Sequence, residues 1–361
     1  MQYHLVLTER CNLNCAYCGG TRHMEGLPLT PIYAIDDLKA FISQDPEAVI
    51  GFYGGEPTLS IPFMEEVMDR VPAKAFTLQT NGTHLSEIPD DYLRRLHSIL
   101  VSVDGPREVT DMNRGSGVYD KLMRHLLDVE RRGYRGDVIA RMAVSKGSDI
   151  HRDVSHLLRM ERPRFHHVHW QLDLFWSDLD SWDDLEGWLR RYDAGISRLI
   201  GDFVEGLRDG KVPGMVPFIP VMKTMMTGIP TPSVRCGSGF NSFAIMTSGR
   251  VEACPIAPEL PFSHAGDIFE STPQQLKGSV PLGAPCTGCD IREVCGGRCL
   301  FSNRTKFWGD EWFDRVCETT RNMIEGLRGL VPLAEELIKK GVLPVDAFDY
   351  PEINNGCEII P

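Results

Sequence analysis

Three cysteines near the start of the chain have the spacing of metal ligands. Cys11, Cys15 and Cys18 form a C-x3-C-x2-C pattern directly after an apolar segment. Three such thiolates can hold three irons of a 4Fe–4S cluster, which normally has four cysteine ligands, so the fourth iron stays open to another ligand. A structural zinc site is the alternative, but zinc requires four protein ligands at other spacings. The pattern therefore favours an iron–sulfur cluster with an open iron.

A second set of cysteines follows in the last third of the chain. The pattern reads C-x12-G-x4-C, then C-x2-C-x5-C-x3-C, then a final C; its members are Cys236, Cys254, Cys286, Cys289, Cys295, Cys299 and Cys317. Zinc ribbons are the alternative, but ribbons repeat C-x2-C and this chain has that spacing once in the set. Two further iron–sulfur clusters are favoured. Cys357 is interpreted as an uninvolved thiol, with the role of an additional ligand left open.

The first half of the chain predicts the elements that must position these ligands. Apolar runs that predict strands alternate with helical patterns such as Met64, Val67, Met68 and Val71. The expected strands cover residues 3–8, 49–53, 75–81, 99–104, 138–144 and 167–175. Alternation of this kind predicts βαβ units and a parallel sheet. Six units are too few for a closed eight-stranded barrel, so we expect an α/β fold with a partial (β/α)6, TIM-like barrel.

Polar segments follow several of these strands, where ligands bind in α/β folds. They are Gly54-Gly55-Glu56-Pro57, Thr80-Asn81-Gly82-Thr83 and Ser102-Val103-Asp104-Gly105. The two-residue period of a strand also places Arg141 on one face with Ile139 and Ala143.

In the sixth expected strand the same period separates two faces. Val168, Trp170, Leu172 and Leu174 lie on one face, and the other is polar, with His167, His169, Gln171 and Asp173. We expect this polar face to line the barrel interior. His167 and His169 lack a visible third ligand, so pocket lining is favoured over a metal pair.

The cysteine triad, its place after the first strand and Tyr17 before the last cysteine resemble the radical S-adenosylmethionine (SAM) superfamily. The resemblance implies that the open iron chelates SAM and that reductive cleavage of SAM gives a 5′-deoxyadenosyl radical, which abstracts a substrate hydrogen. It implies that the GGEP segment binds the SAM ammonium group through Glu56, with glycines that allow close approach of the ligand.

The same resemblance implies further contacts to SAM. The residues expected to bind it are Tyr17, Gly54, Gly55, Glu56, Pro57, Thr80, Asn81, Ser102, Asp104, Arg141 and Gln171. For Arg141 a surface ion pair is the alternative. Asp173, His169 and Tyr53 are candidates for the acid or base that a second proton transfer requires.

The later cysteines resemble the SPASM extension of radical SAM enzymes. By that resemblance Cys236, Cys254 and Cys299 hold a first auxiliary 4Fe–4S cluster. A second cluster has the ligands Cys286, Cys289, Cys295 and Cys317, which makes three clusters in total. The first set has three thiolates, so its cluster has an open iron or takes a ligand from elsewhere, such as Cys357. The expected divisions are 1–190 for the barrel, 191–230 for a helical connection, 231–320 for an irregular SPASM domain with little apolar core, and 321–361 for a helix and tail.

The chain resembles peptide-modifying SPASM proteins of archaea, particularly methanogens, through both cysteine sets, GGEP and residues 245–258. This implies a ribosomally made peptide as substrate and a crosslink such as a thioether as product. A maturase that oxidises one Ser or Cys side chain is the alternative, but such enzymes carry an Asp where Pro255 follows Cys254. The non-enzyme alternative is an iron–sulfur electron carrier, which has no use for an open iron beside a SAM pocket.

The partners expected are a peptide or protein substrate and an electron donor such as ferredoxin or flavodoxin. Because the first motif begins at residue 11, leader recognition is expected to need a separate protein or another surface. The formal net charge of −12 argues against nucleic-acid binding. The sequence has no secretory signal and no long apolar span, so a cytoplasmic location and no membrane contact are expected.

Overall fold

The computed structural model describes residues 1–18, 26–173, 178–258, 260–351 and 353. In these residues one nine-stranded sheet has the order β6-β5-β4-β3-β2-β1-β7-β8-β9. Strands β1 to β7 pair in parallel, and β8 and β9 are antiparallel. The bounds are β1 Gln2–Val6, β2 Val49–Tyr53, β3 Ala75–Thr80, β4 Leu96–Ser102, β5 Asp137–Val144, β6 His167–Leu172, β7 Ser242–Ile245, β8 Arg250–Glu252 and β9 His264–Asp267.

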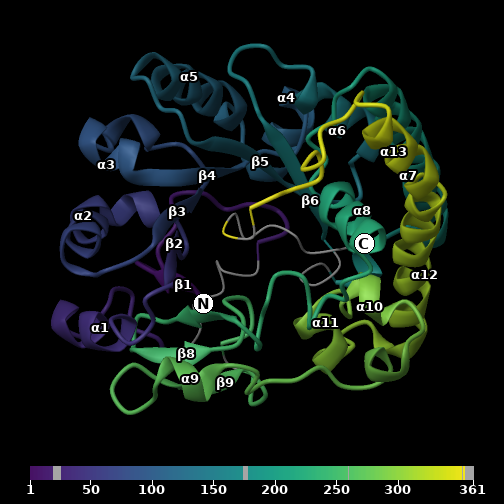
Figure 1. The fold of residues 1–361 in the computed structure, drawn as a ribbon. Helices are drawn as coiled ribbons and strands as arrows, with labels where there is room; N and C mark the ends of the chain where they lie inside the picture. The colour runs from purple at the N-terminus through teal and green to yellow at the C-terminus, as the bar shows by residue number, and fades with distance from the viewer. Residues whose placement is uncertain (19–25, 174–177, 259, 352, 354–361) are drawn as a thin grey trace.

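Helices connect the parallel strands along the outer side of the sheet. They are α1 Ile35–Ile42, α2 Ile61–Arg70, α3 Asp90–Arg95, α4 Arg107–Arg114, α5 Val118–Arg131 and α6 Ile150–Leu158, with short 3-10 turns at η2 Pro57–Ser60 and η3 Leu85–Glu87. Figure 1 shows β1 to β6 curving around the inner side of the molecule with these helices outside. The expected α/β fold with a parallel sheet is confirmed, in the arrangement of a partial TIM-like barrel.

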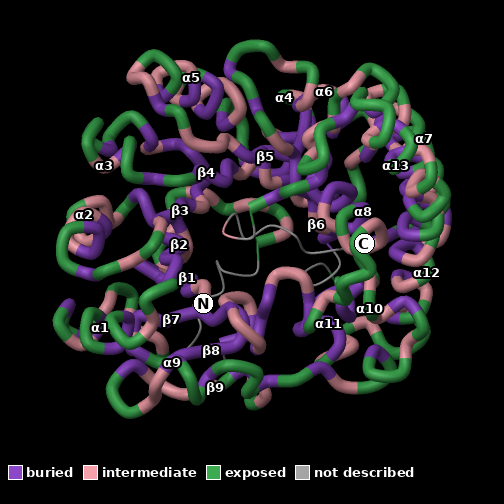
Figure 2. The backbone as a smooth tube through the Cα atoms, in the orientation of Figure 1, coloured by how far each residue is buried: buried purple, intermediate pink, exposed green. Residues whose placement is uncertain are grey.

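The two faces of the sheet have different chemistry. Figure 2 shows the strands as largely buried and the outer surfaces of the helices as exposed. Trp170 of β6 is fully buried; its Nε1 donates to Tyr192 Oη at 3.1 Å and its ring packs edge-on against Phe218. These partners lie on the outer helices, so the neighbouring residue His169 faces the inner side.

The rest of the chain closes the molecule opposite the first strands. Its elements are η4 Leu179–Ser181, α7 Leu185–Arg208, α8 Phe218–Thr227, α9 Pro273–Leu276, η5 Cys286–Gly288, α10 Arg292–Cys295, α11 Leu300–Thr305, α12 Gly309–Arg328 and α13 Val331–Lys339. Figure 1 shows α7, α12 and α13 along the side of the molecule away from α1 and α2. No helix in the described residues is long and apolar enough to span a membrane.

One expectation about residues 231–320 is wrong. They were expected to contain little apolar core, yet all four residues of β7 are buried and β7 pairs in parallel with β1. The main hydrophobic core includes Ile245 and Val316 together with barrel residues such as Leu5. The pattern was missed because a four-residue strand is too short to show a period, and its partner is about 240 residues away. Sheet and core therefore continue across the expected boundary at residue 231.

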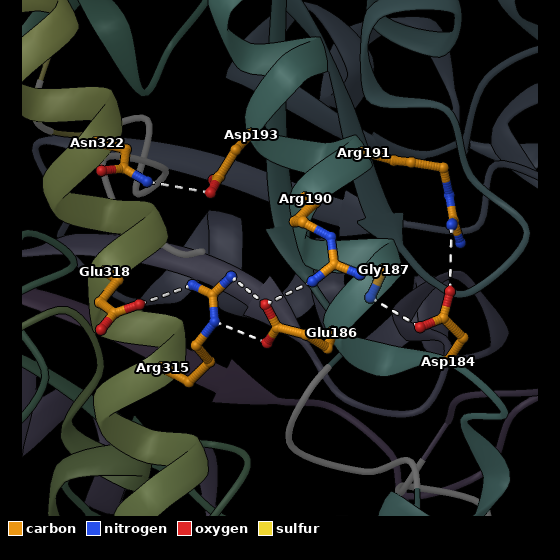
Figure 3. Close-up of polar contacts among 9 residues, drawn as sticks. All are labelled: Asp184, Glu186, Gly187, Arg190, Arg191, Asp193, Arg315, Glu318 and Asn322. Carbon is orange, nitrogen blue, oxygen red and sulfur yellow. Dashed lines mark hydrogen bonds and ion pairs between the residues drawn. The ribbon is translucent and has the colours of Figure 1, made fainter.

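Helices α7 and α12 pack side by side through a polar network, drawn in Figure 3. Arg315 of α12 makes a two-pronged contact with Glu186 of α7, with Nε–Oε2 at 2.8 Å and Nη2–Oε1 at 2.9 Å. Arg315 also donates to Glu318, and Asn322 donates to Asp193 of α7. The network fixes α12, and with it Cys317, against the barrel.

Replacing Arg315 with glutamine is expected to lower the free energy of unfolding by about 1 kcal/mol. The value lies at the upper end for ion pairs outside the core, because the pair is two-pronged and belongs to a network. The shift of the urea midpoint at constant slope measures the change. Arg328→Gln removes an exposed contact with Glu325 within α12 and serves as the control, with a smaller loss expected. Equal losses in the two variants would show that the α7–α12 contact has no special role.

Candidate active site

The GGEP turn after β2 packs directly against the cysteine loop. Gly55 N donates to Thr8 O and Glu56 N donates to Arg10 O, both at 2.8 Å. A Cβ added at Gly54, where φ is +137°, would lie 2.3 Å from Thr8 O, and one at Gly55 would lie 2.3 Å from Arg10 O. The glycines were expected to allow approach of a ligand. Their first role in the structure is to allow approach of the loop that carries Cys11, Cys15 and Cys18.

A Gly55→Ala variant is therefore expected to lose about 2–3 kcal/mol of folding free energy, because the new methyl group overlaps backbone atoms that side-chain rotation cannot move. Gly201→Ala is the matched control. Gly201 lies inside α7 with nothing within 4 Å of an added Cβ, so this change is expected to stabilise by roughly 0.5–1 kcal/mol. Urea unfolding of both variants measures the difference. A tolerated alanine at residue 55 would contradict the close packing described.

Glu56 joins the GGEP turn to the end of β3. Its side chain is buried; Oε1 accepts from Thr58 N at 3.0 Å and from Thr80 Oγ1 at 2.7 Å, while Oε2 accepts from Asn81 N at 2.7 Å. The Thr58 hydroxyl donates to Oε1 as well. Two expected SAM-binding segments are thus held together by one carboxylate. A carboxylate offers about four acceptor positions, and Oε2 keeps capacity for the ammonium group expected there.

Asn81 extends this connection to the cysteine loop. Its Nδ2 donates to Asn12 Oδ1 at 2.8 Å, and Asn12 Nδ2 donates to Thr83 Oγ1 at 2.8 Å. Asn81 Nδ2 also lies 3.9 Å from Cys11 Sγ. The sequence singled out Asn81 but not Asn12, which lies between two prominent cysteines and gives no signal of its own.

The role expected for Asp104 needs correction. It was expected to reach SAM, but it is fully buried and both of its oxygens are bound inside the protein. Arg114 donates to it through Nε at 2.9 Å and Nη2 at 2.8 Å, Tyr17 Oη donates at 2.7 Å, and Ala143 N donates at 3.0 Å. Asn113 Nδ2 is a further donor at 3.3 Å. Asp104 is thus an internal anchor for the cysteine loop.

Arg114 is the main residue of this site that the sequence did not reveal. It lies at the end of α4, its side chain is 8% exposed, and its guanidinium lies 5.4 Å from the centre of the Tyr17 ring. A single arginine on an amphipathic helix usually faces water, so nothing in its neighbourhood distinguishes it. The Tyr17 hydroxyl donates to Asp104, and a contact of Tyr17 with SAM stays a prediction.

The three thiols of the loop form one group. Burial raises the pKa of Cys15 to about 11; the positive charge of Arg114 acts in the opposite direction, and Cys18 and Cys11 raise it further. Burial likewise raises the pKa of Cys11, and Cys18 again adds to the increase. The three cysteines lie within residues 11–18, directly after the segment that packs against the GGEP turn. This placement fits three ligands of one cluster.

The inner face of the barrel is polar beside this loop. Ser102 of β4 is the register partner of Arg141 in β5, and Arg141 is in turn the partner of His169 in β6. Arg141 Nη1 donates to His169 Nδ1, because arginine has donors only. With Nδ1 accepting, the ring hydrogen lies on Nε2. In this arrangement Nε2 can donate a hydrogen bond, whereas the lone pair on Nδ1 is already engaged by Arg141.

Other candidates lie at the same end or along the same face. Tyr53 packs edge-on against His4 of β1 at 5.8 Å, and Asp173 follows β6 with 7% of its surface exposed. Gln171 is half-buried on the inner face of β6. His167 is bound to Asp137 at 2.8 Å at the opposite end of the strands, away from the cysteine loop. The pocket-lining interpretation of His169 and Gln171 fits this arrangement, and their catalytic or SAM-binding roles stay predictions.

The later cysteines are brought together in part. Burial raises the pKa of Cys286 to about 11, and Cys317 and Cys295 raise it further. Burial also raises the pKa of Cys317, with a smaller contribution from Cys289. Helix α10 contacts both η5 and α12, so we call the four cysteines on and beside these elements the second group. Their role as ligands of one cluster stays a prediction.

The other expected set comes from three separate segments of the chain. Cys254 follows β8 and Cys299 precedes α11, and both are buried; Cys236 lies 3.2 Å from Ser238 Oγ. Cys357 lies outside the described residues. Within those residues no three Cys, His, Asp or Glu side chains converge as the ligands of a single metal ion do. Ligands of a four-iron cluster surround a larger body, so that finding bears on mononuclear sites such as zinc.

The fold and the cysteine loop agree with the class of protein that a comparison of the sequence identifies. Residues 5–158 match the model of the Radical SAM superfamily, so the chain contains a radical SAM domain. Among curated proteins, an uncharacterized protein of Methanothermobacter thermautotrophicus is 26% identical over 154 residues, which cover 39% of this chain and 57% of that protein. The chain matches only about half, or less, of the length of such relatives.

Solved structures share the fold over more of the chain. The structure of anSMEcpe with bound AdoMet and the Cp18Cys peptide matches with a TM-score of 0.71 at 18% identity, covering 93% of this chain and 100% of that chain. SuiB of Streptococcus suis bound to its precursor peptide SuiA matches with a TM-score of 0.55 at 13% identity, covering 83% of this chain and 72% of that chain. At identities this low, the structural likeness establishes a common fold alone. The chemistry must be argued from the site.

Proposed function

We propose that this chain is a SPASM-type radical SAM enzyme that abstracts a hydrogen from a ribosomally made peptide and installs a crosslink such as a thioether. The observation that carries the proposal is the pair of thiol groups in one continuous fold. Cys11, Cys15 and Cys18 gather at the carboxyl edge of the barrel, and a second group gathers around α10 and α12. An electron carrier would have no use for an open iron beside the polar inner face of a barrel.

The first group is suited to hold a 4Fe–4S cluster whose open iron binds SAM. When SAM is bound and the cluster is reduced, the cluster and SAM together would supply a 5′-deoxyadenosyl radical. The chain's own part is to hold the loop rigidly, through Gly54, Gly55, Glu56 and Asp104, and to present a polar inner face. Ser102, Arg141 and Gln171 on that face are the residues we propose to contact SAM, with Thr80 and Asn81 at its edge.

Two auxiliary clusters complete the proposed cofactor set. Cys286, Cys289, Cys295 and Cys317 are proposed to hold one, and Cys236, Cys254 and Cys299 the other. We retain 231–320 as the proposed cluster-bearing region, although its first strand belongs to the barrel sheet.

A peptide substrate is supported by the folds that the chain resembles. Both anSMEcpe and SuiB have been solved with peptides bound. The chain also has an inner face lined by Tyr53, His169 and Asp173, which are the proposed residues for handling a second proton. An electron donor such as ferredoxin or flavodoxin, and a separate leader-binding protein, are the partners the proposal implies.

Product analysis tests the peptide assignment. Reduced enzyme, SAM and short peptides encoded beside its gene are incubated without oxygen, and the peptides are analysed by mass spectrometry. Loss of two hydrogens, with fragmentation that fails between two residues, is the expected result. Loss of two hydrogens confined to one Ser or Cys side chain would replace the crosslink with single-residue oxidation. An unmodified peptide despite SAM cleavage would contradict a peptide substrate among those tested.

A further inference from the structure

The backbone between Cys295 and Cys299 follows an unusual path. Gly296, Gly297 and Arg298 have consecutive positive φ angles of 79°, 97° and 58°. The path is fixed by space as well as by torsion, because an added Cβ at Gly296 would lie 2.4 Å from Ser233 O and one at Gly297 would lie 2.6 Å from a Leu282 methyl carbon. A non-glycine residue is uncommon in this region of backbone conformation, and Arg298 adopts it at a buried position.

The turn lies directly against another of the four cysteines. Cys286 Sγ lies 3.8 Å from Gly297 O, and an added Cβ at Gly297 would lie 3.4 Å from Cys286 Cβ. Arg298 therefore leaves the turn beside the cysteines of η5 and α10.

The Arg298 side chain brings a fixed positive charge to the same group. It is 3% exposed, and its guanidinium lies 4.8 Å from the centre of the Phe313 ring on α12. Phe313 precedes Cys317 by four residues in α12, and residues four apart share one face of a helix. The guanidinium therefore lies on the side of α12 that carries this cysteine.

We propose that Arg298 is a positioning residue that sets the reduction potential of the centre held by Cys286, Cys289, Cys295 and Cys317. The inference rests on the proposed function, in which these four cysteines bind an iron–sulfur cluster. Reduction by one electron makes such a centre one charge more negative. A buried cation beside its ligands stabilises that reduced state and raises the potential, since net charge is among the factors that determine it.

The test measures the potential of this centre in the full chain. Cys11, Cys15 and Cys18 are replaced by alanine to remove the first cluster, and iron, sulfide and an EPR-monitored redox titration are recorded. Arg298→Met, which keeps the length but loses the charge, is expected to keep its iron and to titrate at a more negative potential. Arg298→Lys, which keeps the charge, is expected to stay near the parent. Arg321→Met is the control, because Arg321 is a surface arginine near Cys289 that is already paired with Asp290.

Each outcome has a definite meaning. Full iron content with an unchanged potential in Arg298→Met overturns the inference. If Arg298→Met loses iron, retention by Arg298→Lys supports the need for a cation, whereas loss in both variants overturns it in favour of packing. A parent protein that binds no iron after loss of the first three cysteines removes the proposed auxiliary clusters themselves, and so contradicts the proposed function before any variant is compared.

Discussion

An Asp104→Asn variant is expected to lose about 3–5 kcal/mol of folding free energy and most of its SAM cleavage. Removing one partner of a buried ion pair leaves the other charge without compensation, and Arg114 is buried against Asp104 with two short hydrogen bonds. The amide also offers one oxygen where the carboxylate offers two, so Tyr17, Ala143 and Arg114 cannot all remain bound. Since Tyr17 lies between Cys15 and Cys18, the cysteine loop is expected to move.

A double variant separates the two effects. Asp104→Leu with Arg114→Met removes both charges and replaces them with apolar groups, which is often close to neutral for stability. It is expected to recover part of the stability without recovering 5′-deoxyadenosine formation, because the Tyr17 hydroxyl still lacks its acceptor. Urea unfolding and product quantification measure the two properties. An Asp104→Asn protein as stable as the parent would contradict the anchor role.

Replacing Cys11, Cys15 and Cys18 together with alanine is expected to remove about four irons per chain and to reduce 5′-deoxyadenosine to background. The three thiols are the whole protein ligand set proposed for this cluster, so its iron is expected to be lost with them. Iron and sulfide assays, with chromatographic quantification of 5′-deoxyadenosine, measure both changes.

Cys289→Ala is the matched control for this variant. Cys289 belongs to the second group and is half-buried, so its loss is expected to remove iron from an auxiliary centre while SAM cleavage without peptide continues. Loss of SAM cleavage in both variants would show that the two thiol groups do not act separately.

The sequence was sufficient to predict the barrel and the location of its site. Six strands were expected and six were found close to their predicted ends, because each carries several apolar residues between clear turn segments. The polar segments after β2, β3 and β4 meet the cysteine loop as expected, since carboxyl ends of parallel strands share one edge.

The internal partners of the site could not be predicted in the same way. Whether a polar residue contacts a ligand or another part of the chain depends on its burial, and burial depends on contacts between distant segments. Asp104 and Arg114 are ten residues apart across a turn, and Asn12 contacts Thr83 from 71 residues away. The β1–β7 pairing was missed for the same reason, because a short strand shows its role only beside its partner.

Anaerobic incubation of the reduced, iron-loaded protein with SAM tests the central claim most directly. The chain is predicted to release 5′-deoxyadenosine and methionine, and the amount is predicted to fall to background in the Cys11, Cys15 and Cys18 variant. The parent protein is also predicted to contain about twelve irons and twelve sulfides per chain, as three 4Fe–4S clusters require. Fully loaded protein that forms no 5′-deoxyadenosine, with or without peptide, would contradict the account.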